Sequence, residues 1–176
     1  MSLGVGALNT ATTGSWNAAV GGNSLLSNTT GSSNTAVGDD ASRGNTTGGF
    51  NTAVGTRALR NNATGNDNVG IGYQALESNT AGENVAVGNH TLQNNTTGYQ
   101  NTALGTNALL SNTTGYENSA TGLNALRSNT TGRWLTANGA YALRNNTIGE
   151  GNTGIGVMAL ENNTTGNRNT ALGQAA

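Results

Sequence analysis

The stretch that decides the fold reads Asn51-Thr52-Ala53-Val54-Gly55, and it returns along the chain at a nearly constant interval. The copy before it reads Asn34-Thr35-Ala36-Val37-Gly38, and related strings begin at Asn17, Asn68, Asn84, Asn101, Asn118, Leu135, Asn152 and Asn169. Successive copies lie 17 residues apart, except for one step of 16, where we expect a residue to be missing after Glu83. A fixed period of this kind is typical of a solenoid, in which each unit stacks on the next.

With Asn as position 1, the repeat reads Asn-Thr-Ala-Val-Gly-x-x-Ala-Leu-x-Ser/Asn-Asn-Thr-Thr-Gly-x-x. Gly holds position 5 from Gly21 to Gly173 and position 15 from Gly14 to Gly166, and we expect both glycines to supply the positive φ of turns. Positions 1–4 predict a short strand, and each repeat predicts two short strands and two turns. The expected fold is therefore all-β, a parallel β-roll or β-solenoid of about ten coils.

Composition excludes several classes of function. The 176 residues include 30 Asn, 28 Thr and 28 Gly, and the formal net charge of −1 offers no basic field for nucleic acid. With no Cys and one His, the chain predicts no zinc cluster, disulfide or thiol nucleophile. It holds no nucleophile–base pair and no apolar run of about 18 residues. We therefore predict no enzyme activity, no cofactor, no metal and no membrane contact.

The charged residues follow the repeat. All 15 of them, with His90 and all seven aromatic residues, fall at positions 6, 7, 10, 16 and 17. Because burying a charge is costly, we expect these five positions to face solvent and the others to build the rod. Position 3 is Ala or Gly, whereas positions 4 and 9 are mostly large aliphatic residues. Neighbouring strand residues point to opposite faces, so one apolar face lines the coil and the other meets another chain. The chain's expected partner is itself, in a homotrimer.

Asn also holds position 12 in every full repeat. Identical amides in stacked coils can bond to one another as a ladder along the axis. Alternatively, each Asn caps its own Thr-Thr-Gly turn. Both interpretations are structural. The set comprises Asn28, Asn45, Asn62, Asn79, Asn95, Asn112, Asn129, Asn146 and Asn163.

Two repeats break the consensus together and mark a candidate binding site. Position 4 holds Thr121 and then Asn138, which we expect to form a polar ring if this position faces a threefold axis. On the solvent positions nearby, Arg and aromatic side chains suit sugars or acidic groups. This candidate binding patch comprises Arg127, Arg133, Trp134, Tyr141 and Arg144, with Arg127 expected to stack on Arg144.

Strings such as Asn101-Thr102-Ala103-Leu104-Gly105 resemble the YadA-like head repeats, or haemagglutinin/invasin repeats, of trimeric autotransporter adhesins. The resemblance implies a left-handed parallel β-roll, a trimer and display on the bacterial surface, where loops attach to a host-surface or matrix receptor. The repeat here is longer than that family's common head unit. Phage tail-fibre arrays are also similar, and they imply attachment to a virion tail. Stacked Thr residues leave ice binding as a remote alternative.

The repeat covers the chain, so we expect one domain over residues 1–176. Solenoids normally end in atypical polar caps, and neither end of the chain looks like one. We therefore expect a fragment of a longer array, anchored through regions outside it, with residues 1–3 as an expression remnant.

Overall fold

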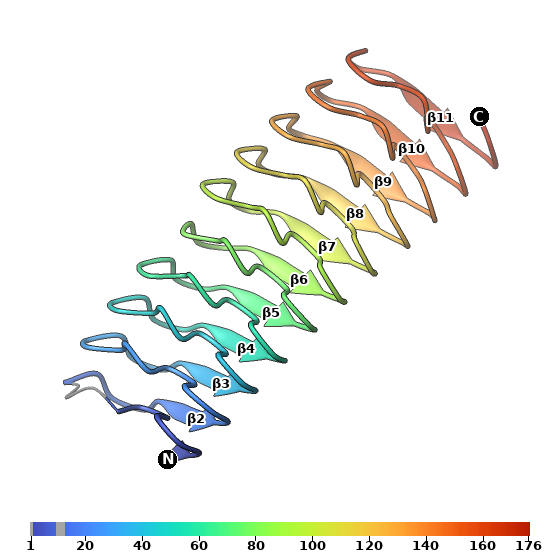
Figure 1. The fold of residues 1–176 in the computed structure, drawn as a ribbon. Coiled ribbons are helices and arrows are strands. Elements are labelled where there is room, and N and C mark those ends of the chain that lie inside the picture. Colours follow the sequence, from blue (N-terminus) through green and yellow to red (C-terminus); the bar gives the residue numbers. More distant parts are fainter. Residues whose placement is uncertain (1, 10–12) are drawn as a thin grey trace.

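A computed structural model describes residues 2–9 and 13–176. The chain winds into a rod of stacked coils, with the two ends of the chain at opposite ends of the rod (Figure 1). Within these described residues, eleven strands form one parallel sheet in sequence order. They are β1 (Ser2–Leu3), β2 (Ala18–Val20), β3 (Thr35–Val37), β4 (Thr52–Val54), β5 (Val69–Ile71), β6 (Val85–Val87), β7 (Thr102–Leu104), β8 (Ser119–Thr121), β9 (Thr136–Asn138), β10 (Thr153–Ile155) and β11 (Thr170–Leu172).

Strand register follows the repeat. In β3 and β4, for example, Thr35 pairs with Thr52 and Val37 pairs with Val54. Each residue therefore lies beside its own copy in the next coil. The predicted all-β parallel solenoid with a 17-residue period is confirmed, with nine steps from β2 to β11 and no helix in the described ranges.

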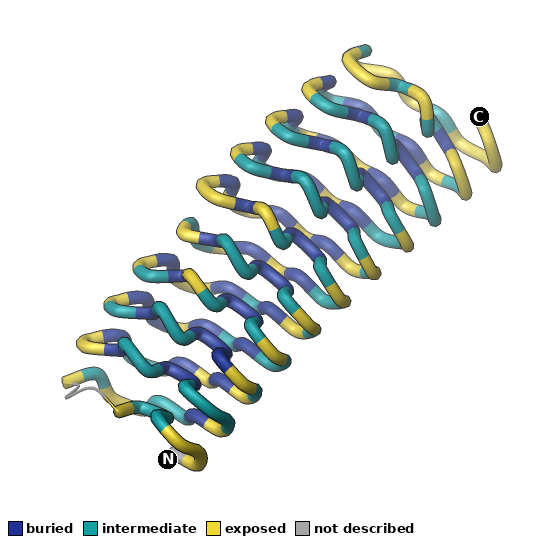
Figure 2. The backbone as a smooth tube through the Cα atoms, viewed as in Figure 1, coloured by how far each residue is buried: buried dark blue, intermediate teal, exposed yellow. Residues whose placement is uncertain are grey.

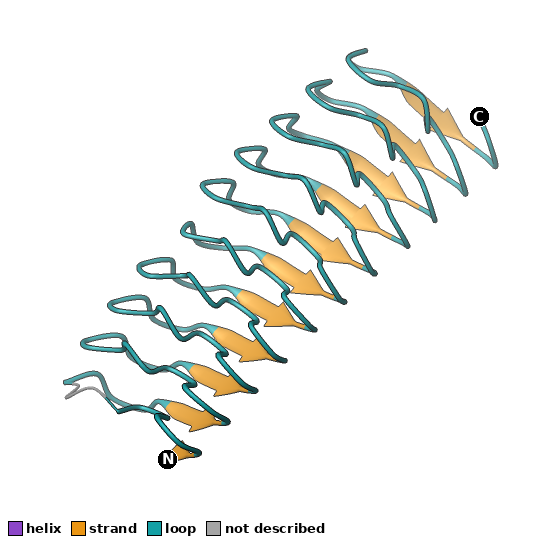
Figure 3. Cartoon of the chain, viewed as in Figure 1, coloured by secondary structure: helices purple, strands orange, loops and turns teal. Residues whose placement is uncertain are grey.

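The prediction of two strands per coil is wrong, because in the described part of the chain each coil has a single strand of two or three residues (Figure 3). The rest of each coil, which we call the return side, is made of turns, because its positions 7, 9 and 17 adopt positive φ. In one coil these are Asn107 (58°), Leu109 (51°) and Glu117 (53°). Left-handed residues at this spacing prevent an extended strand. Backbone bonds to the next coil persist all the same, as from Leu109 N to Ala125 O at 3.0 Å.

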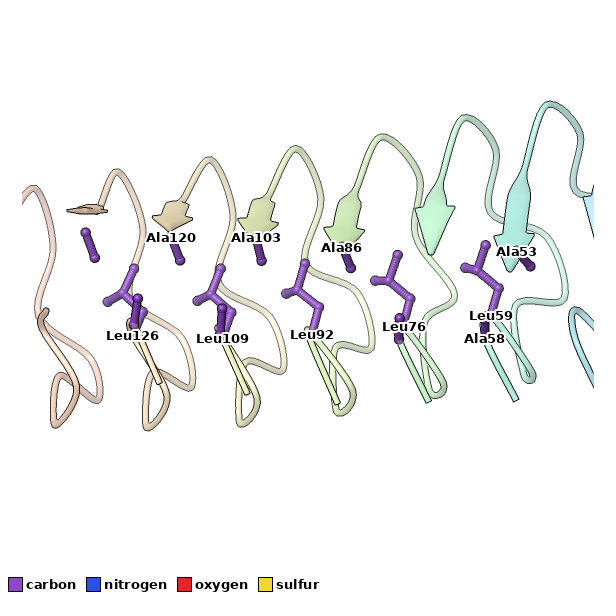
Figure 4. Packing of buried hydrophobic residues seen from close by; sticks show 14 of the residues in the cluster. Ala53, Ala58, Leu59, Leu76, Ala86, Leu92, Ala103, Leu109, Ala120 and Leu126 are labelled. Carbon is purple, nitrogen blue, oxygen red and sulfur yellow. The ribbon is translucent and has the colours of Figure 1, made fainter. Parts of the chain in front are cut away.

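The core is a thin layer between the strand and the return side. Figure 4 shows the strand alanines pointing toward the leucines of position 9, and both Ala120 and Leu109 are fully buried. A left-handed conformation costs a residue such as Leu about 1–2 kcal/mol. Burying its side chain returns about 1.5–3 kcal/mol. Burial therefore outweighs the backbone cost at this position.

Exposure extends beyond the five predicted positions. In β2 to β10 the middle residue is buried, and its neighbours at positions 2 and 4 remain exposed or half-buried (Figure 2). Leu104, at position 4, is 49% exposed. We call this outer surface of the sheet the strand face. It comprises Ala18, Val20, Thr35, Val37, Thr52, Val54, Val69, Ile71, Val85, Val87, Thr102, Leu104, Ser119, Thr121, Thr136, Asn138, Thr153, Ile155, Thr170 and Leu172.

The two recurrent glycines of the repeat serve different purposes. Position 5 has the predicted positive φ, as at Gly105 (127°). Position 15 does not, so the prediction is wrong there. Its glycine is needed because the coils approach closely: a Cβ atom on Gly115 would overlap both Asn112 Oδ1 and Gly132 O.

The short repeat is closed at a different place from the predicted one. Asn79 Nδ2 donates to Ala81 O at 2.7 Å, as Asn112 does to Gly115 O three residues on. Glu83 has the positive φ (61°) of position 17. The missing residue therefore lies in the turn between Asn79 and Ala81, and Ala81 takes position 15 in place of glycine.

Candidate functional site

The position-12 amides lie inside the rod and make both of the bonds considered for them. Asn112 Nδ2 donates to Asn95 Oδ1 at 2.8 Å and to Gly115 O at 2.9 Å. The first bond joins two coils, and the second closes the turn of Asn112 itself. Equivalent inter-coil bonds link Asn28 to Asn45, Asn62 to Asn79, Asn79 to Asn95, Asn112 to Asn129, Asn129 to Asn146 and Asn146 to Asn163.

This ladder has one gap, between Asn45 and Asn62. Asn45 Oδ1 is buried and has no hydrogen-bond partner in the part of the chain that the structure describes. The ladder occupies the interior of the rod, and its amides spend their donors on one another and on turn carbonyls. It therefore holds the coils together and presents no site to a ligand.

A second ladder runs along position 1, and sequence reasoning misses it. Asn118 N donates to Asn101 Oδ1 at 3.1 Å, and Asn118 Nδ2 donates to Gly132 O at 2.9 Å. Leu135 N continues the series by donating to Asn118 Oδ1 at 3.0 Å, but its side chain has no amide with which to extend it. The available signal is the recurrence of Asn just before a buried strand. The period of the repeat does not show that the position-1 Asn is buried, so the recurrence of Asn indicates only that a strand begins there.

The candidate binding patch divides into two groups. Arg133 and Trp134 precede β9, whereas Tyr141 and Arg144 follow it. Arg144 lies over the Tyr141 ring at 5.4 Å and pairs with Glu161 at 3.3 Å. Arg127 lies one coil before Arg144 and has no acidic partner among the described residues. Its buried Nε has no hydrogen bond there either.

Thr121 and Asn138 occupy the strand face as neighbours. They pair in register between β8 and β9. They are the polar interruption of its aliphatic position-4 row, between Leu104 in β7 and Ile155 in β10.

Arg133 and Trp134 join a series that we call the aromatic corner, with Tyr99 and Tyr116 from the two preceding coils. The tyrosine rings stack with centroids 4.8 Å apart, and Trp134 meets Tyr116 edge-on at 6.0 Å. Arg133 Nη1 donates to Tyr116 Oη at 2.6 Å, and the guanidinium lies 4.4 Å from the Trp134 ring centre. The bond to Tyr116 is the main cause that raises the pKa of Arg133, against partial desolvation, and Glu150 adds to the rise.

A hollow of about 400 Å³ follows the aromatic corner. We call it the notch, and it is lined by Trp134, Glu150, Gly151, Asn167 and Arg168. Arg133 Nε pairs with Glu150 Oε1 at 3.1 Å. Glu150 N donates to Asn167 Oδ1 at 2.7 Å. Sequence reasoning identifies Trp134 here but misses the rest, because the hollow depends on the absence of a side chain at Gly151.

Across residues 2–9 and 13–176, no three metal-ligating side chains gather in one place. Within the same ranges, no helix reaches the length and apolar character that a membrane crossing requires. Comparison of the chain with protein-family models, with curated proteins and with solved structures finds no match.

Proposed function

We propose that this chain is a structural and adhesive fibre segment. Three rods associate through their strand faces and present their exposed turns, the aromatic corner among them, for attachment to a host or other surface. The observation that carries the proposal is the strand face itself. It is free of charged residues, and its position-4 row is aliphatic except at Thr121 and Asn138.

Exposed aliphatic rows support self-association because large apolar patches on soluble proteins generally mark interaction sites. The row continues from Val20 to Leu172, so its length equals that of the rod. A partner that matches it coil for coil is another copy of the same chain. The resemblance to trimeric adhesin heads supports three copies, a left-handed winding and a place on the bacterial surface.

In such a trimer, Thr121 and Asn138 would face the common axis. Three Asn138 amides can then hydrogen-bond around a ring, which offsets the cost of placing a polar group between apolar neighbours. A polar layer of this kind favours one alignment of the three chains, since a shifted register would place amides against aliphatic side chains.

Attachment through the exposed turns would be multivalent. Three chains present each turn three times, and linked weak sites raise overall avidity by orders of magnitude without a deep pocket.

The test of association is a pair of variants in one coil. Leu104→Glu places a charge on the strand face, whereas Thr106→Glu places the same charge on the exposed turn beside it. In sedimentation velocity, Leu104→Glu should shift the protein toward single chains, and Thr106→Glu should sediment like the unaltered protein. Equal behaviour of the two variants would exclude the strand face as the interface.

One observation favours a second function, ice binding. Thr35, Thr52, Thr102, Thr136 and Thr153 all lie on the strand face at position 2, so an unassociated rod would expose a flat row of hydroxyl and methyl groups. Measurable thermal hysteresis in a preparation of single chains would support this function. The interruptions of the row at Val69 and Val85 argue against it.

A further inference from the structure

We propose that the notch binds a sugar unit that carries a carboxylate, and that it is an attachment site of the rod. The inference rests on the attachment function proposed above and gives that function a ligand class.

The notch exists because Gly151 has no side chain in the row that the position-17 residues form along the rod. Position 17 carries a side chain in all the other coils, and its residues adopt positive φ, as do Gln100 (54°) and Arg168 (57°). Gly151 has the same backbone conformation (65°), so the conformation itself does not require glycine here. A Cβ on Gly151 would make only an ordinary contact, 3.5 Å from Arg168 Cγ. What glycine provides at this place is the space between Trp134 and Arg168.

The wall formed by Trp134 is held in place. Its Nε1 donates to Glu117 Oε2 at 3.2 Å, while Tyr116 and Arg133 pack against its ring. Half of the Trp134 surface remains exposed. A fixed indole offers a flat apolar surface at little entropic cost, which suits the apolar face of a sugar ring.

The charges of the notch select an anion. Glu150 is already paired with Arg133, so these two charges offset each other. Arg168 has no acidic partner among the residues that the structure describes, and its side chain is exposed at the edge of the notch. Arg168 is therefore the lining guanidinium that is left for a ligand, and its planar fork matches a carboxylate.

The other lining groups suit hydroxyls. The Glu150 carboxylate can accept hydrogen bonds, and the Asn167 side chain can donate them. The volume of about 400 Å³ lies within the range of about 300–1,000 Å³ that is typical of small-molecule sites. A neutral sugar would leave Arg168 unpaired, and an acidic peptide would leave the indole without a flat partner. A carboxylated sugar can stack on Trp134 and also pair with Arg168.

The chain's two tryptophans make the test direct. In the ¹⁵N-labelled full chain, one indole N–H signal comes from Trp134 in the notch. The other comes from Trp16, which is 87% exposed and lies just before β2, near the opposite end of the rod. We expect methyl glucuronide or methyl sialoside to shift the Trp134 signal saturably while the Trp16 signal stays still. Methyl glucoside should bind at least tenfold more weakly.

Three variants complete the experiment. Gly151→Gln fills the notch with a residue that the same position already holds at Gln100, so the rod should fold and lose the Trp134 response. Arg168→Gln should reduce the response at least tenfold, whereas Arg57→Gln, on another corner, should leave it unchanged. No saturable shift with either acidic sugar would overturn the proposal. A response to acetate or to an acidic peptide as strong as that to the sugars would also overturn it, as would an undiminished response in Gly151→Gln.

The notch lies within one chain, so this result is independent of whether three chains associate. If the notch binds no sugar, the sedimentation experiment still tests association. If the chains do not associate, the sugar titration still tests the notch.

Discussion

A single residue in this rod acts through its copies in the neighbouring coils. Asn112 receives a bond from Asn129, donates one to Asn95 and closes its own turn at Gly115. Its removal therefore leaves the buried Asn95 Oδ1 without its donor, and it takes one of two hydrogen bonds from both Gly115 O and Asn129 Nδ2. A buried polar group left unpaired costs about 1–3 kcal/mol.

We expect Asn112→Ala to lower the free energy of unfolding by about 1–3 kcal/mol, measured by denaturant unfolding. Thr114→Ala is the control, because Thr114 is exposed two residues away. If the two variants unfold at the same denaturant concentration, the ladder does not stabilise the rod.

Two adjacent leucines test the division between core and surface. Leu109 is fully buried, whereas Leu110 is half-buried on the outside, one coil before Arg127. Leu109→Glu should prevent folding or destabilise the rod by several kcal/mol, because it buries a charge. Leu110→Glu should shift the thermal midpoint little or upward, because it offers Arg127 an acidic neighbour like the Glu161 that pairs with Arg144. A similar loss of stability in both variants would contradict the assignment of faces.

The coil, as an element, is a strand and a series of turns that must return in register to the next strand. The 16-residue repeat keeps this register by shortening the turn between Asn79 and Ala81, since Asn79 still bonds Ala81 O and Asn62. On the other side of the turn, Gln100 Nε2 still reaches Glu83 Oε2 at 2.7 Å.

The position of the missing residue can be tested by insertion. Adding Thr after Thr80, together with Ala81→Gly, restores the consensus turn and should leave the thermal midpoint unchanged or raise it. Adding Gly after Glu83 instead inserts a residue just before β6 and should lower the midpoint, because it separates the position-17 residue from the strand that it adjoins. The opposite order of midpoints would show that the missing residue lies after Glu83, as the sequence predicts.

The strand, the period and the parallel stacking could all be predicted, because the repeat of Ala53 and Val54 carries them in the sequence itself. The single strand per coil could not be predicted, because leucine at position 9 ordinarily disfavours the left-handed conformation that Leu109 adopts. Burial imposes that conformation, and burial depends on the whole stack. The role of the glycine at position 15 could not be predicted for the same reason, since it consists in contact between coils.

The candidate site could be predicted only in part. Arg133 and Trp134 stand out by residue type, but the hollow beside them arises from Gly151, a residue without a side chain in a chain rich in glycine. Position 17 of the repeat holds a signal, since Gly151 is the one glycine there. Its meaning depends on the stacking of Trp134 and Arg168 on either side.

At the scale of the whole molecule, the rod has a thin core and one long uncharged surface. Its interior is mostly Ala, Leu and Asn, while the aliphatic row of position 4 lies outside. In a single chain this row is only partly buried, so it contributes less to stability than the fully buried leucines of position 9. Association would bury it in every coil, so we expect folding and assembly to be coupled and the thermal midpoint to rise with protein concentration.

The mass of the folded particle tests the central claim most directly. Light scattering coupled to size-exclusion chromatography should give a mass near three times the 17.6 kDa of one chain, for a sample that melts cooperatively. A cooperatively folded particle of 17.6 kDa would contradict it, because the strand face would then be stable in water without another chain.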